Sequence, residues 1–75
     1  MEVRAVTVDA TNVNDAKRSA VVALRGDRFD PLRILEAKTE GFVRFDGSSS
    51  IFRYRVEVQG VTLEENEARG IYGDR

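Results

Sequence analysis

Cysteine and histidine are both absent from this 75-residue sequence. Without cysteine, the chain can form no disulfide, no thiolate zinc site and no cysteine nucleophile. Without histidine, it lacks the commonest general base and the commonest transition-metal ligand of proteins. We therefore expect a chain that is not an enzyme and that holds no metal ion and no cofactor.

Long apolar runs are also missing. The longest uninterrupted one covers residues 20–24, whereas a membrane-spanning helix needs about 20 residues. No basic region followed by an apolar stretch opens the chain, so we expect no signal peptide. Hydrophobic residues make up 41% and charged residues 33% of the sequence, proportions typical of a globular domain rather than a disordered or membrane protein. A cytoplasmic protein is expected.

The length and the charge distribution predict one small domain with a tail. A chain of this size buries only about 60% of its unfolded surface, so a partner, often a second copy, commonly adds stability. The formal net charge is −1, which gives little long-range attraction for nucleic acid. We expect a single domain over residues 1–60. Residues 61–75 are rich in glutamate and are expected to form an acidic tail that is extended, frayed or a short helix.

A strand followed by a helix is predicted at the start of the chain. Residues 2–10 show period-two alternation with many β-branched side chains, which predicts the strand. The helix should begin after Asn12, because Asp15 stands three residues later in the spacing of a capping box. Gly26 is expected to end it in the left-handed conformation. The predicted buried side of the helix has three- and four-residue spacing and consists of Val13, Ala16, Ala20 and Leu24.

Two further strands are predicted over residues 32–38 and 42–46. Pro31 is expected to precede the earlier one, because proline cannot donate a hydrogen bond to a sheet. Residues 39–41 are expected to form a three-residue hairpin loop with Gly41 left-handed. The apolar residues of the earlier strand fall on both of its faces, so either a bulge interrupts it or both faces are covered.

The clearest alternation in the sequence, over residues 51–59, predicts a fourth strand after a four-residue loop at 47–50. Cross-strand partners share a face, and both predicted hairpins place apolar residues on the same inner face. The expected fold class is α+β, a two-layer β-α-β-β-β domain with one helix packed on one face of a mainly antiparallel four-stranded sheet. The expected inner face consists of Leu35, Ala37, Val43, Phe45, Phe52, Tyr54, Val56 and Val58.

The sheet face away from the helix is the one grouping that looks like a binding site. It is predicted to carry Lys38, Phe42, Arg44, Arg53 and Arg55. Basic side chains around an aromatic ring are typical of single-stranded nucleic-acid platforms, but the pI of 5.4 and the single ring fall short of that footprint. The alternatives are a solvated face of ion pairs and, since the predicted register puts Arg44 opposite Arg53, docking on an anionic protein surface.

Several apolar residues are not absorbed by the predicted inner face. They predict an interface between copies of the chain, because exposed apolar patches commonly mark interfaces. The alternative is that a bulge turns the earlier ones inward and the tail folds back over the sheet. These residues are Leu32, Ile34, Phe42, Val61 and Leu63, and all of them except Phe42 are expected at the interface between copies.

Residues 6–20, Val-Thr-Val-Asp-Ala-Thr-Asn-Val-Asn-Asp-Ala-Lys-Arg-Ser-Ala, resemble the strand, cap and Asp-Ala-Lys-x-x-Ala opening of many small phage-encoded proteins. Some anti-CRISPR proteins and some phage inhibitors of bacterial RNA polymerase look like this. The resemblance implies a compact strand-helix-strand inhibitor that binds a large host complex. It transfers no functional residue, because the shared positions are those that fold the domain.

These observations lead to one functional hypothesis and two alternatives. We expect a small non-enzymatic protein-binding module, an inhibitor or adaptor of phage or mobile-element origin, that docks its open sheet face or an edge strand on a host protein complex in the host cytoplasm. One alternative is a nucleic-acid-binding accessory protein that uses the arginine-rich face. The other is a structural homo-oligomer, such as a homodimer. No membrane partner is expected.

Overall fold

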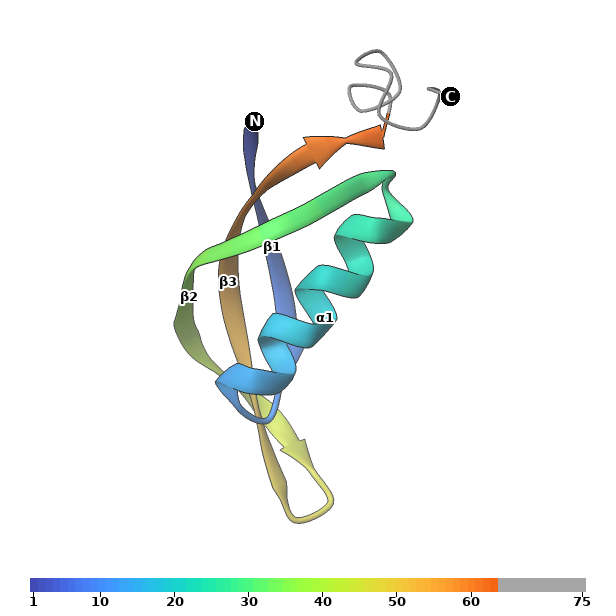
Figure 1. Cartoon of the computed structure of the whole chain (residues 1–75). Helices are drawn as coiled ribbons and strands as arrows, with labels where there is room; N and C mark the ends of the chain where they lie inside the picture. Colours follow the sequence, from blue (N-terminus) through green and yellow to red (C-terminus); the bar gives the residue numbers. More distant parts are fainter. Residues whose placement is uncertain (64–75) are drawn as a thin grey trace, which may run out of the picture.

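The computed structural model describes residues 1–63, which form one helix packed on one face of a three-stranded antiparallel sheet (Figure 1). The elements are β1 (Glu2–Ala10), α1 (Val13–Gly26), β2 (Phe29–Asp46) and β3 (Ser49–Thr62), and the order in the sheet is β1-β3-β2. The predicted α+β class is confirmed, but the sheet has three strands and not four. No helix in residues 1–63 is long and apolar enough to cross a membrane.

The two middle strands expected from the sequence are one strand. Residues 39–41 do not turn the chain back, because Lys38 pairs with Arg55 of β3 and Gly41 with Arg53 of the same strand. Gly41 has a positive φ of 131°, as expected, but it lies beside a register shift inside β2. Glycine with positive φ serves a bulge as well as a hairpin loop, and the 14-residue β3 supplies a partner that continues past it.

Strand β2 is strongly irregular. Its register against β3 shifts at four places, each of which leaves one residue without a partner: Leu32, Leu35, Glu40 and Val43. Because of these shifts, Leu35 is exposed and Val43 has no cross-strand partner, so the expectation of a regular inner face at these two positions is wrong. Pro31 lies inside the strand and not before it, which an edge strand beside a bulge tolerates.

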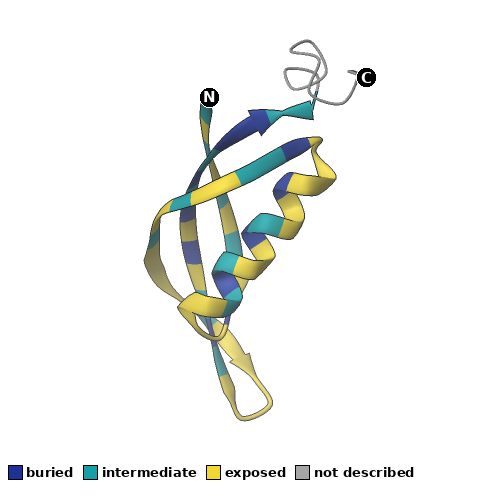
Figure 2. Cartoon of the chain, viewed as in Figure 1, coloured by how far each residue is buried: buried dark blue, intermediate teal, exposed yellow. Residues whose placement is uncertain are grey.

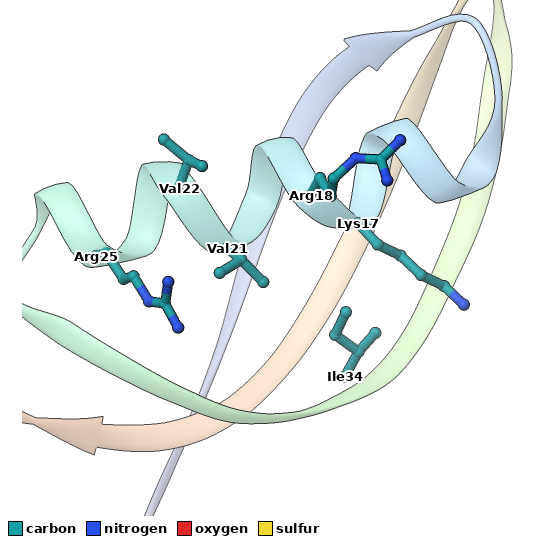
Figure 3. A pocket seen from close by; sticks show the side chains of 6 residues that line it. All are labelled: Lys17, Arg18, Val21, Val22, Arg25 and Ile34. Carbon is teal, nitrogen blue, oxygen red and sulfur yellow. The ribbon is translucent and has the colours of Figure 1, made fainter.

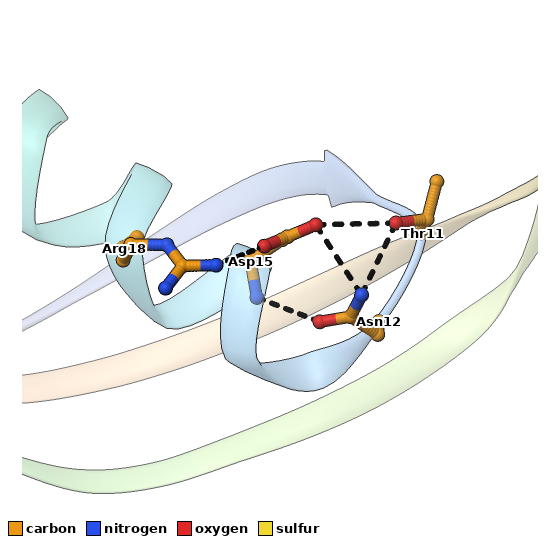
Figure 4. A network of polar contacts seen from close by, with 4 residues as sticks. All are labelled: Thr11, Asn12, Asp15 and Arg18. Atoms are coloured by element: carbon orange, nitrogen blue, oxygen red, sulfur yellow. Dashed lines mark hydrogen bonds and ion pairs between the residues drawn. The ribbon is translucent and has the colours of Figure 1, made fainter.

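The start of α1 follows the sequence prediction. The Asn12 side chain accepts a hydrogen bond from the Asp15 backbone N–H at 2.9 Å. The Asp15 carboxylate in turn accepts hydrogen bonds from the Thr11 hydroxyl at 3.2 Å and the Asn12 amide at 3.3 Å, and it forms an ion pair with Arg18 (Figure 4). The predicted cap is therefore confirmed, with a side-chain network added to it.

The end of α1 differs from the prediction. Gly26 is the last helical residue, and the left-handed residue is Arg28, with φ 61°. The backbone N–H groups of Asp27 and Arg28 donate to the carbonyls of Leu24 and Arg25 at 3.0 and 3.1 Å, so the last turn closes two residues beyond the glycine. The expectation that Gly26 is the left-handed stop is wrong, because the hydrogen bonds of the last turn place the positive φ later.

The core lies between α1 and the middle of the sheet (Figure 2). The small side chains of Ala16 and Ala20 let the helix lie close to β3, whose Val56 and Val58 are fully buried. Phe29, 1% exposed, closes one end of the core. The core cluster consists of Ala10, Ala16, Ala20, Leu24, Phe29, Tyr54, Val56 and Val58.

Phe29 is held between a cation and a glycine. The Arg4 guanidinium carbon lies 4.6 Å from the centroid of its ring, a cation–π distance. On β3, Gly60 comes so close that a Cβ atom there would lie 2.2 Å from the Asp30 carbonyl oxygen and 2.8 Å from the Phe29 ring. A side chain at position 60 is therefore incompatible with this close approach of β2 to β3.

The hairpin between β2 and β3 turns more tightly than expected. Asp46 pairs with Ser49, so the loop is the two residues Gly47 and Ser48 and not the four residues 47–50. Gly47 has φ 63°, which suits the turns that match the twist of a hairpin. The shorter loop shifts the pairing of the preceding β2 residues against β3 by two positions from the predicted register.

Candidate protein-binding site

Four of the five residues predicted to bind a partner share the sheet face away from α1, here called the open face. Lys38 pairs with Arg55, and Arg44 follows on the same side of β2, opposite Ile51. Arg53 and Arg55 alternate with the buried Tyr54 and Val56, so they point away from the helix.

Phe42 is not on the open face. It pairs with Phe52, which is in step with Tyr54 on the helix side of β3. The predicted grouping of this ring with the arginines is therefore wrong, because the bulges at Glu40 and Val43 lie on either side of Phe42 and reverse its face. Every aromatic residue within 1–63 that pairs in the ladder lies on the helix side, so the open face described here has no ring on which a base could stack.

The arginines of the open face are matched by carboxylates. Asp9 of β1 accepts a hydrogen bond from the Nε of Arg53 at 3.0 Å and lies 4.0 Å from the Arg44 guanidinium. The predicted pairing of Arg44 with Arg53 is wrong, and both side chains approach one aspartate. Arg55 forms an ion pair with Glu57. The open face is therefore a surface of mixed charge.

The pKa values of these groups follow from the pairing. The hydrogen bond from Arg53, followed by its positive charge, holds the pKa of the Asp9 carboxyl below its usual value, although partial desolvation opposes this. The same hydrogen bond raises the pKa of Arg53, and Glu57 raises that of Arg55. Asp9, Arg53 and Arg55 are exposed and Glu57 is half-buried, so the pairs organise the surface more than they stabilise the fold.

Three phenylalanines form a cluster at the far end of the sheet. The ring centroids of Phe42 and Phe45 are 5.1 Å apart and those of Phe42 and Phe52 are 5.8 Å apart, both edge to face. Phe52 is half-buried, whereas Phe42 is 53% and Phe45 71% exposed. The expectation that Phe45 lies in the core is wrong.

The cluster is exposed because the hairpin of β2 and β3 extends beyond β1 and α1. Strand β1 ends at Ala10, opposite Phe52, and α1 begins at Val13. Beyond that point β2 and β3 pair only with each other and form an arm, defined here as residues 42–52, that projects past the helix (Figures 1 and 2). The rings face the helix side of the sheet, but the arm carries them beyond the cover of the helix.

A second apolar surface lies beside the helix. An open groove between α1 and β2 has Val21, Val22 and Ile34 as its apolar lining, with the basic side chains of Lys17, Arg18 and Arg25 around them (Figure 3). Val22 is 70% exposed, while Ile34 also packs against the core. The groove is open to solvent, unlike an enclosed ligand pocket.

The structure does not bring the four predicted interface residues to one exposed surface. Val61 is buried at 4% exposure, Leu32 is 55% exposed, and Ile34 is half-buried beneath the helix. Leu63 is half-buried, and its backbone N–H donates to the Arg28 carbonyl at 3.0 Å. The register shift between Pro31 and Arg33 changes the parity between the two β2 residues, so their shared face is lost.

Within residues 1–63, no group of three or more histidine, cysteine, aspartate or glutamate side chains is placed to hold a metal ion. Comparisons of the chain with protein-family models, with curated proteins and with solved structures found no match. The arm is the strongest candidate site on geometric grounds. Its signal in the sequence was the spacing of Phe42 and Phe45, three residues apart in a segment predicted to alternate every two.

Proposed function

We propose that this chain is a small non-enzymatic protein-binding module that inserts the rings of Phe42 and Phe45 into an apolar pocket of a partner protein. The observation that supports this most is the exposure of both rings on one side of a projecting arm. Large aromatic side chains dominate binding energy at protein interfaces. Exposed apolar clusters are otherwise avoided on small domains, because they favour aggregation.

The arm is suited to rigid binding. The rings of Phe42, Phe45 and Phe52 support one another edge to face, which restricts their side-chain rotation before any partner arrives. The two-residue turn and the antiparallel pairing hold the backbone of the arm. Binding groups that are already ordered lose less entropy on association.

The open face contributes to this proposal in a secondary role. Arg44 lies on the arm with its side chain on the opposite side from the rings, and it is 59% exposed. Its distance of 4.0 Å from Asp9 leaves the guanidinium able to approach a carboxylate at the rim of a partner's pocket. The resemblance to phage-encoded inhibitors stays a prediction, and it would make that partner a host protein complex.

The experiment begins with site-specific cross-linking. The photoreactive analogue benzoylphenylalanine is placed at Phe45 in one variant and at Val22 in another, since both positions are strongly exposed and apolar. The cells that produce each variant are irradiated. Mass spectrometry then identifies any protein that is cross-linked to position 45 and not to position 22. That protein is then purified, and its Kd is measured for the wild-type chain, Phe45→Ala and Val22→Ala.

The proposal predicts that Phe45→Ala weakens binding by at least about tenfold, the loss expected for an interface hot spot, and that Val22→Ala changes the Kd by less than about twofold. Thermal stability should change little in both variants, because both side chains are exposed and Phe45→Ala removes only the edge-to-face contact with Phe42. Equal affinities of the wild type and Phe45→Ala would contradict the proposal. So would a cross-link at position 45 to nucleic acid or lipid alone.

A further inference from the structure

Strand β1 leaves one side of the sheet without a described neighbour. It pairs with β3 along its whole length, Glu2–Ala10, and it is the first strand in the order β1-β3-β2. In an antiparallel ladder, roughly half of the backbone N–H and C=O groups of an edge strand point away from its partner. Water or another strand must satisfy those groups.

The two edges of the sheet differ in how they resist a new strand. Strand β2 contains Pro31 and four register shifts, features that discourage pairing at an edge. Strand β1 has the sequence Glu-Val-Arg-Ala-Val-Thr-Val-Asp-Ala, with no proline, glycine or lysine, and its register against β3 is continuous. Within residues 1–63, the β1 edge is therefore the more regular of the two edges on which a partner strand can pair.

Burial along β1 is incomplete in the way expected for a strand that lacks a neighbour. Val6 and Val8 face the helix and pack against the core, yet both are only half-buried, whereas Val56 and Val58 of the central strand are fully buried. On the other face, Val3 is 54% exposed. A strand laid beside β1 would cover the outer sides of these valines.

We propose that β1 pairs antiparallel with β1 of a second copy of this chain, so that two sheets join into one of six strands. A second copy is favoured because β1 can lie antiparallel to itself without charge repulsion. In the register that overlaps all nine residues, Val6 lies opposite its own counterpart on the two-fold axis, Arg4 opposite Val8, and Ala5 opposite Thr7. No like charges face each other, and apolar Val6 meets Val6 on the helix side.

The register is tested with cysteines, which the natural chain lacks. Ala5→Cys and Thr7→Cys are both exposed substitutions on the open face. Directly opposite residues of an antiparallel pair are about 5 Å apart and can form a disulfide, while diagonal neighbours at about 7–8 Å cannot do so without movement. Under mild oxidation, a mixture of the two variants should give cross-linked dimer on a non-reducing gel, and neither variant alone should do so.

The dimer itself is tested by molar mass. Size exclusion with light scattering should give twice the 8.4 kDa of the chain for the wild type. The double variant Ala5→Glu with Thr7→Glu places carboxylates opposite each other twice, so it should be monomeric, and so should Ala5→Lys with Thr7→Lys. In the monomer, residue 5 lies opposite Glu57 and residue 7 lies opposite Arg55. Each double variant therefore gains one attraction and one repulsion within the chain, so the stability of the monomer should change little.

Mixing the acidic and basic double variants should restore the dimer mass, because opposite charges then face each other across the axis. A wild-type mass of one chain at every concentration would overturn the proposal. So would a dimer whose mass is unaffected by either double variant, or disulfides that form in each cysteine variant alone as readily as in the mixture. The arm takes no part in this contact, so failure here leaves the proposed function intact.

Discussion

At the scale of single residues, replacing glycine with alanine should have opposite effects on stability at two positions. We predict that Gly60→Ala destabilises the domain by about 1–3 kcal/mol, the usual cost of overpacking, because its Cβ would lie 2.2 Å from the Asp30 carbonyl oxygen. Gly26→Ala should stabilise it by up to about 1 kcal/mol, because that residue is helical and its Cβ would meet nothing within 4 Å.

Urea unfolding followed by circular dichroism measures both effects. Gly26→Ala is the matched control, since it adds the same methyl group to the same residue type. A Gly60→Ala variant as stable as the wild type would show that β2 does not approach β3 at Gly60 as closely as described.

Asp9 predicts a pH dependence of stability. Its folded-state pKa is lowered, chiefly by the hydrogen bond from Arg53, so its contribution is present above the unfolded pKa and is lost as pH falls through the folded value. Asp9→Asn should therefore be less stable than the wild type at pH 7, and the difference should shrink as pH falls through the lowered pKa of the Asp9 carboxyl. Thermal melts across pH 2–7 test this. A difference that is constant with pH would contradict it.

The sequence could predict some of these residues and not others. Asn12 could be recognised as a cap because its partner, Asp15, is three residues away. The need for glycine at position 60 could not be recognised, since it depends on the ring of Phe29 and on a carbonyl of another strand. Local partners leave a signal in the sequence, and contacts between distant segments leave none in a single chain.

At the scale of elements, the cap of α1 makes a direct prediction. Asn12→Ala removes the side chain that accepts the Asp15 N–H, so it should lower the free energy of unfolding by about 1 kcal/mol. Asn14→Ala is the control, because Asn14 is exposed inside the same helix and alanine has the higher helix propensity. Chemical denaturation of both variants measures the effect, and a loss as large in Asn14→Ala would rule out capping as its cause.

Strand β2 shows why the four-stranded prediction was wrong. The residues Thr39, Glu40 and Gly41 are suitable for a hairpin loop, but the same residues suit a bulge. Pairing decides between the two, and β3 extends far enough to pair with both halves of β2. Two bulges within the segment 39–44 then place Phe42 on the helix side, so the predicted site was divided between two faces.

The alternating strands were predictable for the opposite reason. Strand β1 agrees with the predicted range of 2–10, and β3 contains the predicted 51–59, because each alternates without interruption. Two residues of the predicted tail, at 61 and 62, belong to β3. The rest of the predicted tail beyond residue 63 lies outside the described residues.

At the scale of the whole molecule, the charge arrangement predicts weak binding to nucleic acid. The net charge is −1, and the arginines of the open face lie beside Asp9 and Glu57. We expect the Kd for a short single-stranded DNA to be weaker than about 100 µM at physiological salt. Fluorescence anisotropy with a labelled oligonucleotide tests this. Micromolar affinity with a steep salt dependence, abolished by Arg53→Glu with Arg55→Glu, would instead favour the nucleic-acid alternative.

The proposed dimer and the proposed arm combine simply. Because the two β1 strands would run antiparallel, the arms of the two copies would point to opposite ends of the joined sheet. Two identical anchors held at a fixed separation raise the effective affinity for a partner that presents two pockets. A partner with one pocket would gain nothing from the dimer.

Fluorine NMR reports whether the exposed rings of the arm enter a partner protein. The chain has four phenylalanines, of which Phe29 is buried in the core and serves as an internal reference. All four are replaced with para-fluorophenylalanine, and the cross-linked partner is added in purified form. We predict that the signals of Phe42 and Phe45 shift or broaden while that of Phe29 stays unchanged. Unchanged signals from Phe42 and Phe45 at a saturating concentration of the partner would contradict the proposed function.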